Sequence, residues 1–247
     1  THRGSSAASD VYKRQIICFI IALPILFFQA GGFEGMAMSF ENKGMPNNMS
    51  LFGVLSFRDV INFTLPSFLL ILGDANMYQR FFASESVKSA QKATFLLFFA
   101  VVILESLIIA NAWISSSMIT DIAKESHVLI YAAYNFLPPI VGAIMLATII
   151  GIIISTADSF LLVPTTILIN DIYLKYSNKK YSDKMIVTLS RILVLALGFF
   201  SYWVSRMFAA DTTIFEKALY AFTIYGTAIT PTPVSYTHLT LPTNLCV

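Results

Sequence analysis

Ala147–Tyr173 reads ATIIGIIISTADSFLLVPTTILINDIY and is the most informative stretch of this chain. It is apolar enough to lie in a lipid bilayer, yet polar residues occupy its middle. Water-free hydrocarbon penalises such groups, so polar residues at mid-membrane depth indicate a functional site. On a helix, residues three and four positions apart share one face, which predicts a polar stripe. Its members are Thr148, Ile152, Ser155, Thr156 and Ser159.

The composition of the 247-residue chain is that of a membrane protein. Hydrophobic residues make up 56% of it and charged residues 12%, and the mean hydropathy is +0.71. Soluble domains carry about one quarter charged residues. The net charge of +2 gives no case for nucleic-acid binding. The sequence contains no nucleophile elbow, zinc-protease helix or phosphate-binding loop, which argues against an enzyme.

Both ends of the chain read as translated sequencing adapter. Ser5–Gln15, SSAASDVYKRQ, back-translates to a DNA string that resembles a transposase library adapter. The reverse complement of that string encodes VSYTHLTLPT, which is Val234–Thr243. One oligonucleotide therefore accounts for both ends. We expect residues 1–15 and 233–247 to be adapter-derived and residues 16–232 to be the native segment, and only the latter enters the reasoning about function.

Apolar runs in the native segment predict an all-α membrane protein. A span needs about twenty apolar residues, so the short first run is expected to be the end of a truncated helix. The predicted spans cover residues 16–28 (truncated), 54–82 (broken), 93–118, 138–169, 185–207 and 218–232 (truncated). The expected loops between them are Gln29–Gly53, Ser84–Lys92, Ile119–Phe136, Asp171–Lys184 and Ala209–Lys217.

The second run contains signals of a helix break. Pro66 lies inside it, and Gly73-Asp74 interrupts it shortly before Asn76. In transporters, broken spans line the substrate site because their freed backbone groups face water or ligand. The alternative is that Gly73 marks the cytoplasmic end of the span and that the residues after it are interfacial. Spacing alone leaves both interpretations open.

Loop charges predict how the spans are oriented. Most of the basic residues of the native segment fall in or beside the second and fourth loops, and the positive-inside rule places those loops in the cytoplasm. The helix with the polar stripe then runs from the outside to the inside. The basic residues concerned are Arg80, Lys88, Lys92, Lys175, Lys179, Lys180, Lys184 and Arg191.

Ser155 and Thr156 are candidate ligands of a sodium ion. Adjacent hydroxyls leave a helix about 100° apart and can approach an ion in a groove, and hard cations prefer oxygen ligands. The carbonyl of Ile152, one turn earlier, would join them where the hydroxyls perturb the helical ladder. The alternative is that both hydroxyls bond back to carbonyls of the preceding turn or hold two helices together.

Two carboxylates lie within predicted spans. Asp158, together with Ser159, is a candidate for a second cation site or a proton site, and the alternative is an ion pair between Asp158 and Arg191. Glu105 lies near the centre of its span, where a carboxylate needs a cavity, a proton or a partner. Its role, structural or proton-linked, stays open. Pro164 predicts a bend in the lower part of the stripe helix.

Several of these residues carry the pattern of a known family. LGDANMYQRFFASESVKSAQKA (Leu72–Ala93) and IIISTADSFLLVPTTILINDIYLKY (Ile152–Tyr176) resemble two segments of the sodium:solute symporter family. Further matches are Ser190-Arg191, Tyr225-Gly226 and Ile229-Thr230-Pro231. The resemblance covers nearly all of residues 16–232, in order and with fitting spacings.

The resemblance implies part of a five-plus-five inverted-repeat transporter fold, in which solute and sodium are held midway across the membrane. The first span would end the first repeat, and the later spans would form most of the second. The family's sodium site matches the hydroxyls of Ser155 and Thr156 and the carbonyl of Ile152. Its remaining ligands lie on a first core helix that we do not expect in this segment. The substrate-side broken helix would include Gly73, Asp74 and Asn76.

The implied function is sodium-coupled symport of a small organic solute across the cell membrane, incomplete in this segment. Sodium would be the transported ion, and the partners would be the solute, sodium and the lipid bilayer. A rival is a membrane sensor or scaffold of the same fold, in which the stripe serves helix packing; a fused signalling domain in the uncut gene would favour it. A channel is a third option, although no repeated pore motif is present.

Overall fold

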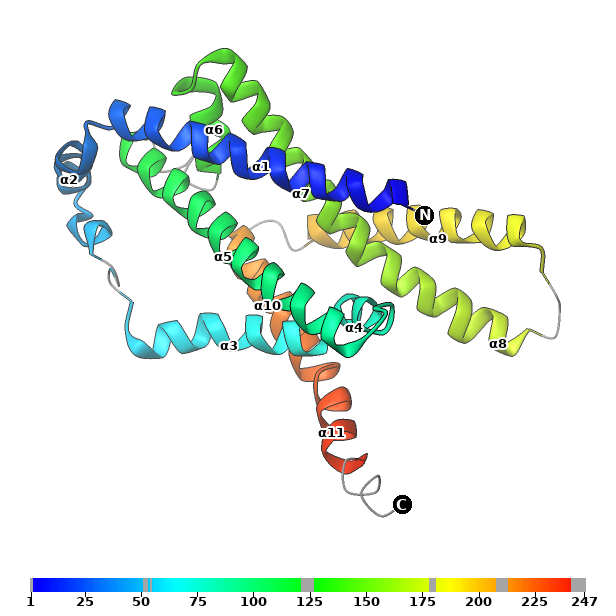
Figure 1. Cartoon of the computed structure of the whole chain (residues 1–247). Helices are drawn as coiled ribbons and strands as arrows, with labels where there is room; N and C mark the ends of the chain where they lie inside the picture. The colour runs from blue at the N-terminus through cyan, green and yellow to red at the C-terminus, as the bar shows by residue number, and fades with distance from the viewer. Residues whose placement is uncertain are drawn as a thin grey trace. The chain divides into compact units, whose positions relative to one another are not determined.

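The computed structural model describes residues 2–50, 53, 55–120, 127–177, 181–207 and 213–240, without the side chains of residues 2–15, 80, 233 and 237–240. All the regular structure in these residues is helical (Figure 1). The elements are α1 (His2–Gln29), α2 (Gly32–Asn42), the 3-10 helix η1 (Pro46–Met49), α3 (Phe57–Gly73), α4 (Ala75–Phe82), α5 (Val87–Met118), α6 (Val128–Asn135), α7 (Pro139–Thr166), the π-helix η3 (Ile167–Tyr173), α8 (Leu174–Tyr176), α9 (Asp183–Met207), α10 (Ile214–Ala228) and α11 (Pro231–Thr240).

Several of these helices are long and apolar enough to cross a membrane. Four runs qualify by themselves, and a fifth is a bent pair formed by Ile16–Gln29 and Gly32–Asn42, whose parts meet at 68°. The prediction of an all-α, multi-pass membrane protein is therefore confirmed. The four runs are Phe57–Gln79, Val87–Met118, Pro139–Tyr176 and Asp183–Met207.

The chain divides into two compact units. Unit 1 comprises Thr1–Arg58 and Ser84–Ile153, and unit 2 comprises Asp59–Ala83 and Ile154–Val247. The boundary falls inside α7, which is a continuous helix. The first half of α7 therefore belongs to unit 1, and its second half, with the polar residues, belongs to unit 2.

The prediction that Gln29–Gly53 is a loop was wrong, because this segment contains α2. Gly31 and Gly32 adopt left-handed φ angles of 77° and 65°, which only glycine accepts readily, and they form the turn after α1. Beyond this turn Met36 and Phe40, four residues apart, are both buried. The glycines predicted a loop, but the helical spacing of the apolar side chains favours a helix that packs on the core.

Two further loop predictions need correction. The segment Ser84–Lys92 is mostly helical, since α5 begins at Val87, and its cap Ser86 accepts a hydrogen bond from the Ser89 N–H over 3.2 Å. The expected loop Ile119–Phe136 contains α6, an apolar helix. Residues 121–126 lie outside the described residues. The polar residues of the first segment thus form the first turns of α5, and α6 is stabilised by the burial of Ala132 and Ala133.

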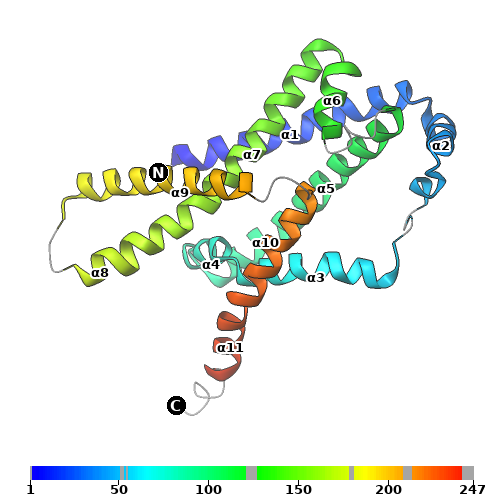
Figure 2. The same ribbon diagram turned by 180° about the vertical axis from the view of Figure 1, so that it is seen from behind.

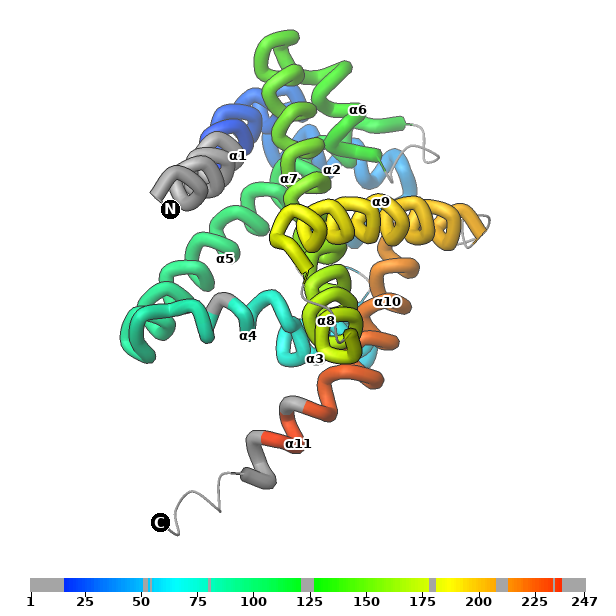
Figure 3. The backbone as a smooth tube through the Cα atoms, turned by 90° about the vertical axis from the view of Figure 1, so that its right-hand side faces the viewer, coloured from blue at the N-terminus to red at the C-terminus, as the bar shows by residue number. Residues whose placement is uncertain are grey.

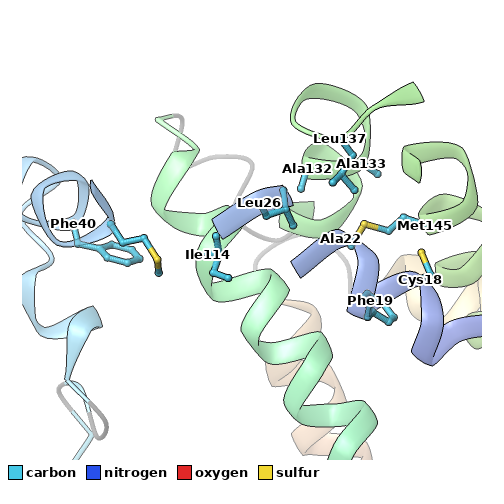
Figure 4. Packing of buried hydrophobic residues seen from close by; sticks show 11 residues of the cluster. Cys18, Phe19, Ala22, Leu26, Phe40, Ile114, Ala132, Ala133, Leu137 and Met145 are labelled. Carbon is cyan, nitrogen blue, oxygen red and sulfur yellow. The ribbon is translucent and has the colours of Figure 1, made fainter. Parts of the chain in front are cut away.

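The core of unit 1 is apolar and is formed by α1, α2, α5, α6 and the first half of α7 (Figure 4). Its largest fully buried apolar side chains are Phe19, Phe40, Leu26, Met36 and Met145. Helices α6 and α7 approach closely at Gly142, where a Cβ would overlap the backbone of α6. The other members of the core are Cys18, Ala22, Ile114, Ala132, Ala133 and Leu137.

Lys43, just after α2, holds the C-terminal end of α5. Its ammonium donates hydrogen bonds to the carbonyl oxygens of Ser116 and Ser117 over 2.7 and 2.6 Å. The hydroxyl of Ser39 also donates to the Ser117 carbonyl. The last carbonyls of a helix lack helical donors and carry partial negative charge, so a cation at this end stabilises the helix.

We expect Lys43→Met in the full-length protein to lower the free energy of unfolding by about 1–3 kcal/mol, because two carbonyls lose a charged donor. The measurement is thermal unfolding of the detergent-purified protein. The matched control is Lys92→Met, since Lys92 is an exposed lysine near the other end of α5. Equal melting temperatures for the two variants would contradict this role of Lys43.

Unit 2 holds α3, α4, α9, α10, α11 and the second half of α7. Figure 3 follows the chain from α9 through α10 into α11. A capping box begins α10: the Glu216 N–H donates to the Thr213 hydroxyl, and the Thr213 N–H donates to the Glu216 carboxylate over 2.8 Å. The hydrogen bonds from the Thr213 backbone and hydroxyl lower the pKa of the Glu216 carboxyl below its usual range. The expected loop Ala209–Lys217 thus ends at Thr213, and residues 208–212 lie outside the described residues.

Helix α7 and the helical segments after it cover the predicted span 138–169 and continue as far as Tyr176. Helix α7 passes through Pro164 without ending, and the departure from α-helical geometry follows at the π-helix Ile167–Tyr173. Proline removes a backbone donor, and the next two hydroxyls, those of Thr165 and Thr166, donate to carbonyls four residues earlier. The π-helix directly follows these two threonines. The segment from Asp171, which was expected to be a loop, is therefore helical as far as Tyr176.

Candidate functional site

The polar residues of the stripe divide along α7. Ser155, Thr156 and Asp158 are exposed in the structure. Thr148, in contrast, is buried and shares a side-chain hydrogen bond with Cys18 of α1. The first member of the stripe therefore serves a helix contact inside unit 1, whereas Ser155 and Thr156 are exposed on the part of α7 that belongs to unit 2.

The hydroxyls of Ser155 and Thr156 have no hydrogen-bond partner within the described part of the chain. Many other helical hydroxyls bond back to their own helix. Ser159 donates to the Ser155 carbonyl over 3.1 Å, and Thr165 donates to the Leu161 carbonyl over 2.7 Å. The hydroxyls of Ser155 and Thr156 therefore do not form the alternative hydrogen bonds to carbonyls of the preceding turn. Both side chains are exposed, so their hydroxyl oxygens are accessible to a hard cation.

The carbonyl of Ile152 stays within a regular helix. We expected the neighbouring hydroxyls to perturb the helical ladder at this point, but α7 keeps α-helical geometry from Pro139 to Thr166. A carbonyl oxygen has two lone pairs, so Ile152 has one left for an ion while its helical hydrogen bond is intact. Ile152 precedes Ser155 and Thr156 by three and four residues, so this oxygen lies about one turn before the hydroxyl pair.

The two carboxylates predicted within spans stand alone. Asp158 and Arg191 are both exposed and form no ion pair in the part of the chain that the structure describes, so the predicted alternative for Asp158 is not made. Glu105, on α5, is exposed and likewise has no ion pair among the described residues. A cation site at Asp158 and Ser159 stays a prediction.

The predicted break in the second span is present. Helix α3 ends at Gly73, α4 begins at Ala75, and Asp74 between them is extended, with φ −68° and ψ 107°. One carboxylate oxygen of Asp74, Oδ1, accepts hydrogen bonds from the Asn76 N–H over 2.9 Å and from the Asn76 side-chain amide over 3.1 Å. Asp74 therefore caps α4, and its other carboxylate oxygen takes no part in the cap.

Side-chain hydroxyls satisfy the carbonyls that the break frees. The Leu72 carbonyl accepts a hydrogen bond from the Tyr78 hydroxyl over 2.8 Å, and the Gly73 carbonyl accepts one from the Tyr225 hydroxyl over 3.1 Å. We expected such freed groups to face water or ligand. Two of them are instead held by tyrosines, one from α4 and one from α10.

Asn111 is a buried polar residue that the sequence analysis missed. It lies on α5 with no exposed surface, and its amide donates to the carbonyls of Phe19 and Leu107 over 3.1 and 2.8 Å. The oxygen of its side-chain amide, Oδ1, has no partner among the described residues. The signal was present in the sequence, since an amide inside an apolar span must face protein rather than lipid. Asn111 joins α5 to α1.

These features define a multi-pass α-helical protein of the cell membrane that has a broken span and a helix with outward hydroxyls. The model of the sodium:solute symporter family matches residues 15–234, and the chain belongs to this family. The family is one of transporters rather than of enzymes.

Curated relatives of the chain include two proline transporters. The osmoregulated proline transporter OpuE of Bacillus subtilis is 23% identical over 218 residues, which cover 86% of this chain and 43% of the relative. A sodium/proline symporter of Haemophilus influenzae is 25% identical over 191 residues, 71% of this chain and 38% of the relative. The chain thus spans about two fifths of the length of these relatives. No solved structure matches the chain significantly.

Proposed function

We propose that this chain is part of a symporter that couples the entry of sodium to the uptake of a small organic solute. Membership of the sodium:solute symporter family supports the class of activity. The observation that carries the proposal is the pair of hydroxyls on α7, Ser155 and Thr156, which have no partner among the described residues. A span that bears two unbonded hydroxyls and a carboxylate is costly in lipid unless a ligand uses them.

Sodium would bind to the hydroxyl oxygens of Ser155 and Thr156 and to the carbonyl oxygen of Ile152. These oxygens lie on one helix, so they supply only one side of a coordination shell. The rest would come from another helix of the whole transporter, and the bound ion would join the two. Sodium then binds more tightly to the conformational state that brings both helices together. This difference in sodium affinity between the two states couples sodium binding to solute binding. Asp158 and Ser159 would serve a second cation.

The broken helix at Gly73, Asp74 and Asn76 is the proposed solute side. Its support is the extended residue at the break, whose second carboxylate oxygen is outside the cap. Proline is the first solute to test, because the two curated relatives are proline transporters by name. A zwitterionic solute carries an ammonium group, which a carboxylate at this position can bind.

We expect Ser155→Ala with Thr156→Ala, in the full-length transporter, to raise the sodium concentration for half-maximal uptake by roughly tenfold or more, because an ion loses two oxygen ligands. The measurement is uptake of labelled proline into cells or proteoliposomes across a range of sodium concentrations. Sodium replaced by choline gives the background.

Two control variants accompany this measurement. Thr166→Val removes a hydroxyl of the same helix that bonds back to Leu162, and Thr156→Ser keeps the hydroxyl. Both should leave the sodium dependence near the wild type. An unchanged sodium dependence in the double variant, at normal expression, would refute the assignment of the hydroxyl pair.

Asp74 separates a capping role from a solute-binding role. Asparagine caps helices as well as aspartate does, so Asp74→Asn keeps the cap but removes the negative charge. We expect this variant to raise the KM for a cationic or zwitterionic solute several-fold and to leave the melting temperature unchanged. If only Asp74→Ala has an effect, and that effect is on stability, then Asp74 is a cap and nothing more.

A further inference from the structure

Two hydroxyls from the end of α10 reach the last turn of α3. The Tyr225 hydroxyl donates to the Gly73 carbonyl over 3.1 Å, and the Thr230 hydroxyl donates to the Leu69 carbonyl over 2.6 Å. Thr230 has almost no exposed surface. Both acceptors belong to α3, whose end is the break at Asp74. Tyr225 lies in the last turn of α10, and Thr230 lies between α10 and α11, which follow one another in Figure 2.

Glycines allow the two helix ends to approach this closely. A Cβ on Gly73 would overlap the Thr230 hydroxyl, and a Cβ on Gly226 would lie 2.8 Å from the Cβ of Leu69. Both glycines are buried. Each helix end thus contributes one glycine and one side chain to a reciprocal contact, which leaves no room for a larger residue at either glycine.

A second contact joins the same two helices nearer their N-termini. The rings of Phe63 on α3 and Phe215 on α10 pack edge to face, with their centroids 5.4 Å apart. The pair of helices is therefore held at two places, by aromatic packing at one and by hydroxyl–carbonyl hydrogen bonds at the other. Only the second place lies at a helix break.

We propose that Tyr225 and Thr230 are positioning residues for transport, which hold the end of α3 against the end of α10 and so fix the geometry of the break at Asp74. The inference rests on the proposed function, since it makes the broken helix the solute side. Neither residue needs to touch the solute. The Gly73 carbonyl precedes the extended residue directly, so a displaced Gly73 changes the direction in which the Asp74 carboxylate points.

Helix α10 supplies matched controls for both residues. Tyr220 is a tyrosine of the same helix that is 66% exposed, so Tyr220→Phe controls for Tyr225→Phe. Among the described residues Thr227 bonds only to carbonyls of its own helix, so Thr227→Val controls for Thr230→Val. Thr230→Ser is the conservative variant, because it keeps the donor to Leu69.

The first measurement is hydrogen–deuterium exchange of the purified full-length protein, followed in peptides that cover residues 69–80. Each lost hydrogen bond should speed exchange there by roughly two- to tenfold, because the end of α3 opens more often. Tyr225→Phe and Thr230→Val should show this increase. Tyr220→Phe, Thr227→Val and Thr230→Ser should not.

The second measurement is sodium-driven uptake of labelled proline, read as KM for the solute and as the sodium concentration for half-maximal uptake. We expect Tyr225→Phe and Thr230→Val to raise the solute KM about three- to tenfold at normal surface abundance. The sodium dependence should stay within about twofold of the wild type, since the hydroxyls of Ser155 and Thr156 are intact.

Three results would overturn the inference. If residues 69–80 exchange no faster in Tyr225→Phe and Thr230→Val than in the control variants, the two hydroxyls do not hold the end of α3. If exchange is faster but the solute KM is unchanged, the contact stabilises the fold and has no positioning role in transport. A wild type without sodium-dependent uptake overturns the proposed function and the positioning role together, and the exchange comparison then judges the contact by itself.

Discussion

The structure depends on one constraint, which is that every backbone carbonyl and N–H in a lipid-buried helix needs a partner inside the protein. Regular helices meet it by themselves, and most of this chain is helical. Where a helix breaks or ends, side chains must take over. Lys43 does this for the end of α5, the Asp74 carboxylate does it for the start of α4, and tyrosine hydroxyls do it for the end of α3.

The same constraint separates structural hydroxyls from candidate ligands. A serine or threonine that bonds back to its own helix has used its donor locally and adds little to the exterior. Thr165 and Thr166 on α7 are of this kind. Ser155 and Thr156, about three turns earlier on the same helix, have no such bond within the described residues. One helix thus contains both uses of a hydroxyl, and the difference marks the proposed ion site.

The sequence predicted the features that a single helix determines. The spans at α5, α7 and α9 and the break at Gly73-Asp74 follow from apolar runs and from residues that interrupt them. The helices α2 and α6 could not be predicted in this way, since each becomes stable by packing Met36 and Phe40, or Ala132 and Ala133, against a core formed by distant segments. The burial of Asn111 could have been predicted from its place in an apolar span, but its acceptor on α1 could not, because that carbonyl is far away in the sequence.

Contacts between distant helices also explain why the two helix breaks belong together. Neither Tyr225 nor Thr230 carries a charge or a motif whose chemistry is recognisable by itself, and each gains meaning only from a carbonyl on α3. The Gly73 carbonyl at the break has no helical donor, so the Tyr225 hydroxyl both satisfies it and fixes its direction. The Thr230 hydroxyl adds a second donor to the Leu69 carbonyl, one turn before the end of α3. The buried glycines at the contact let the two helices approach so closely that no larger side chain fits there. A broken helix in a membrane can therefore keep a defined shape only with the help of a neighbour, and in unit 2 that neighbour is α10.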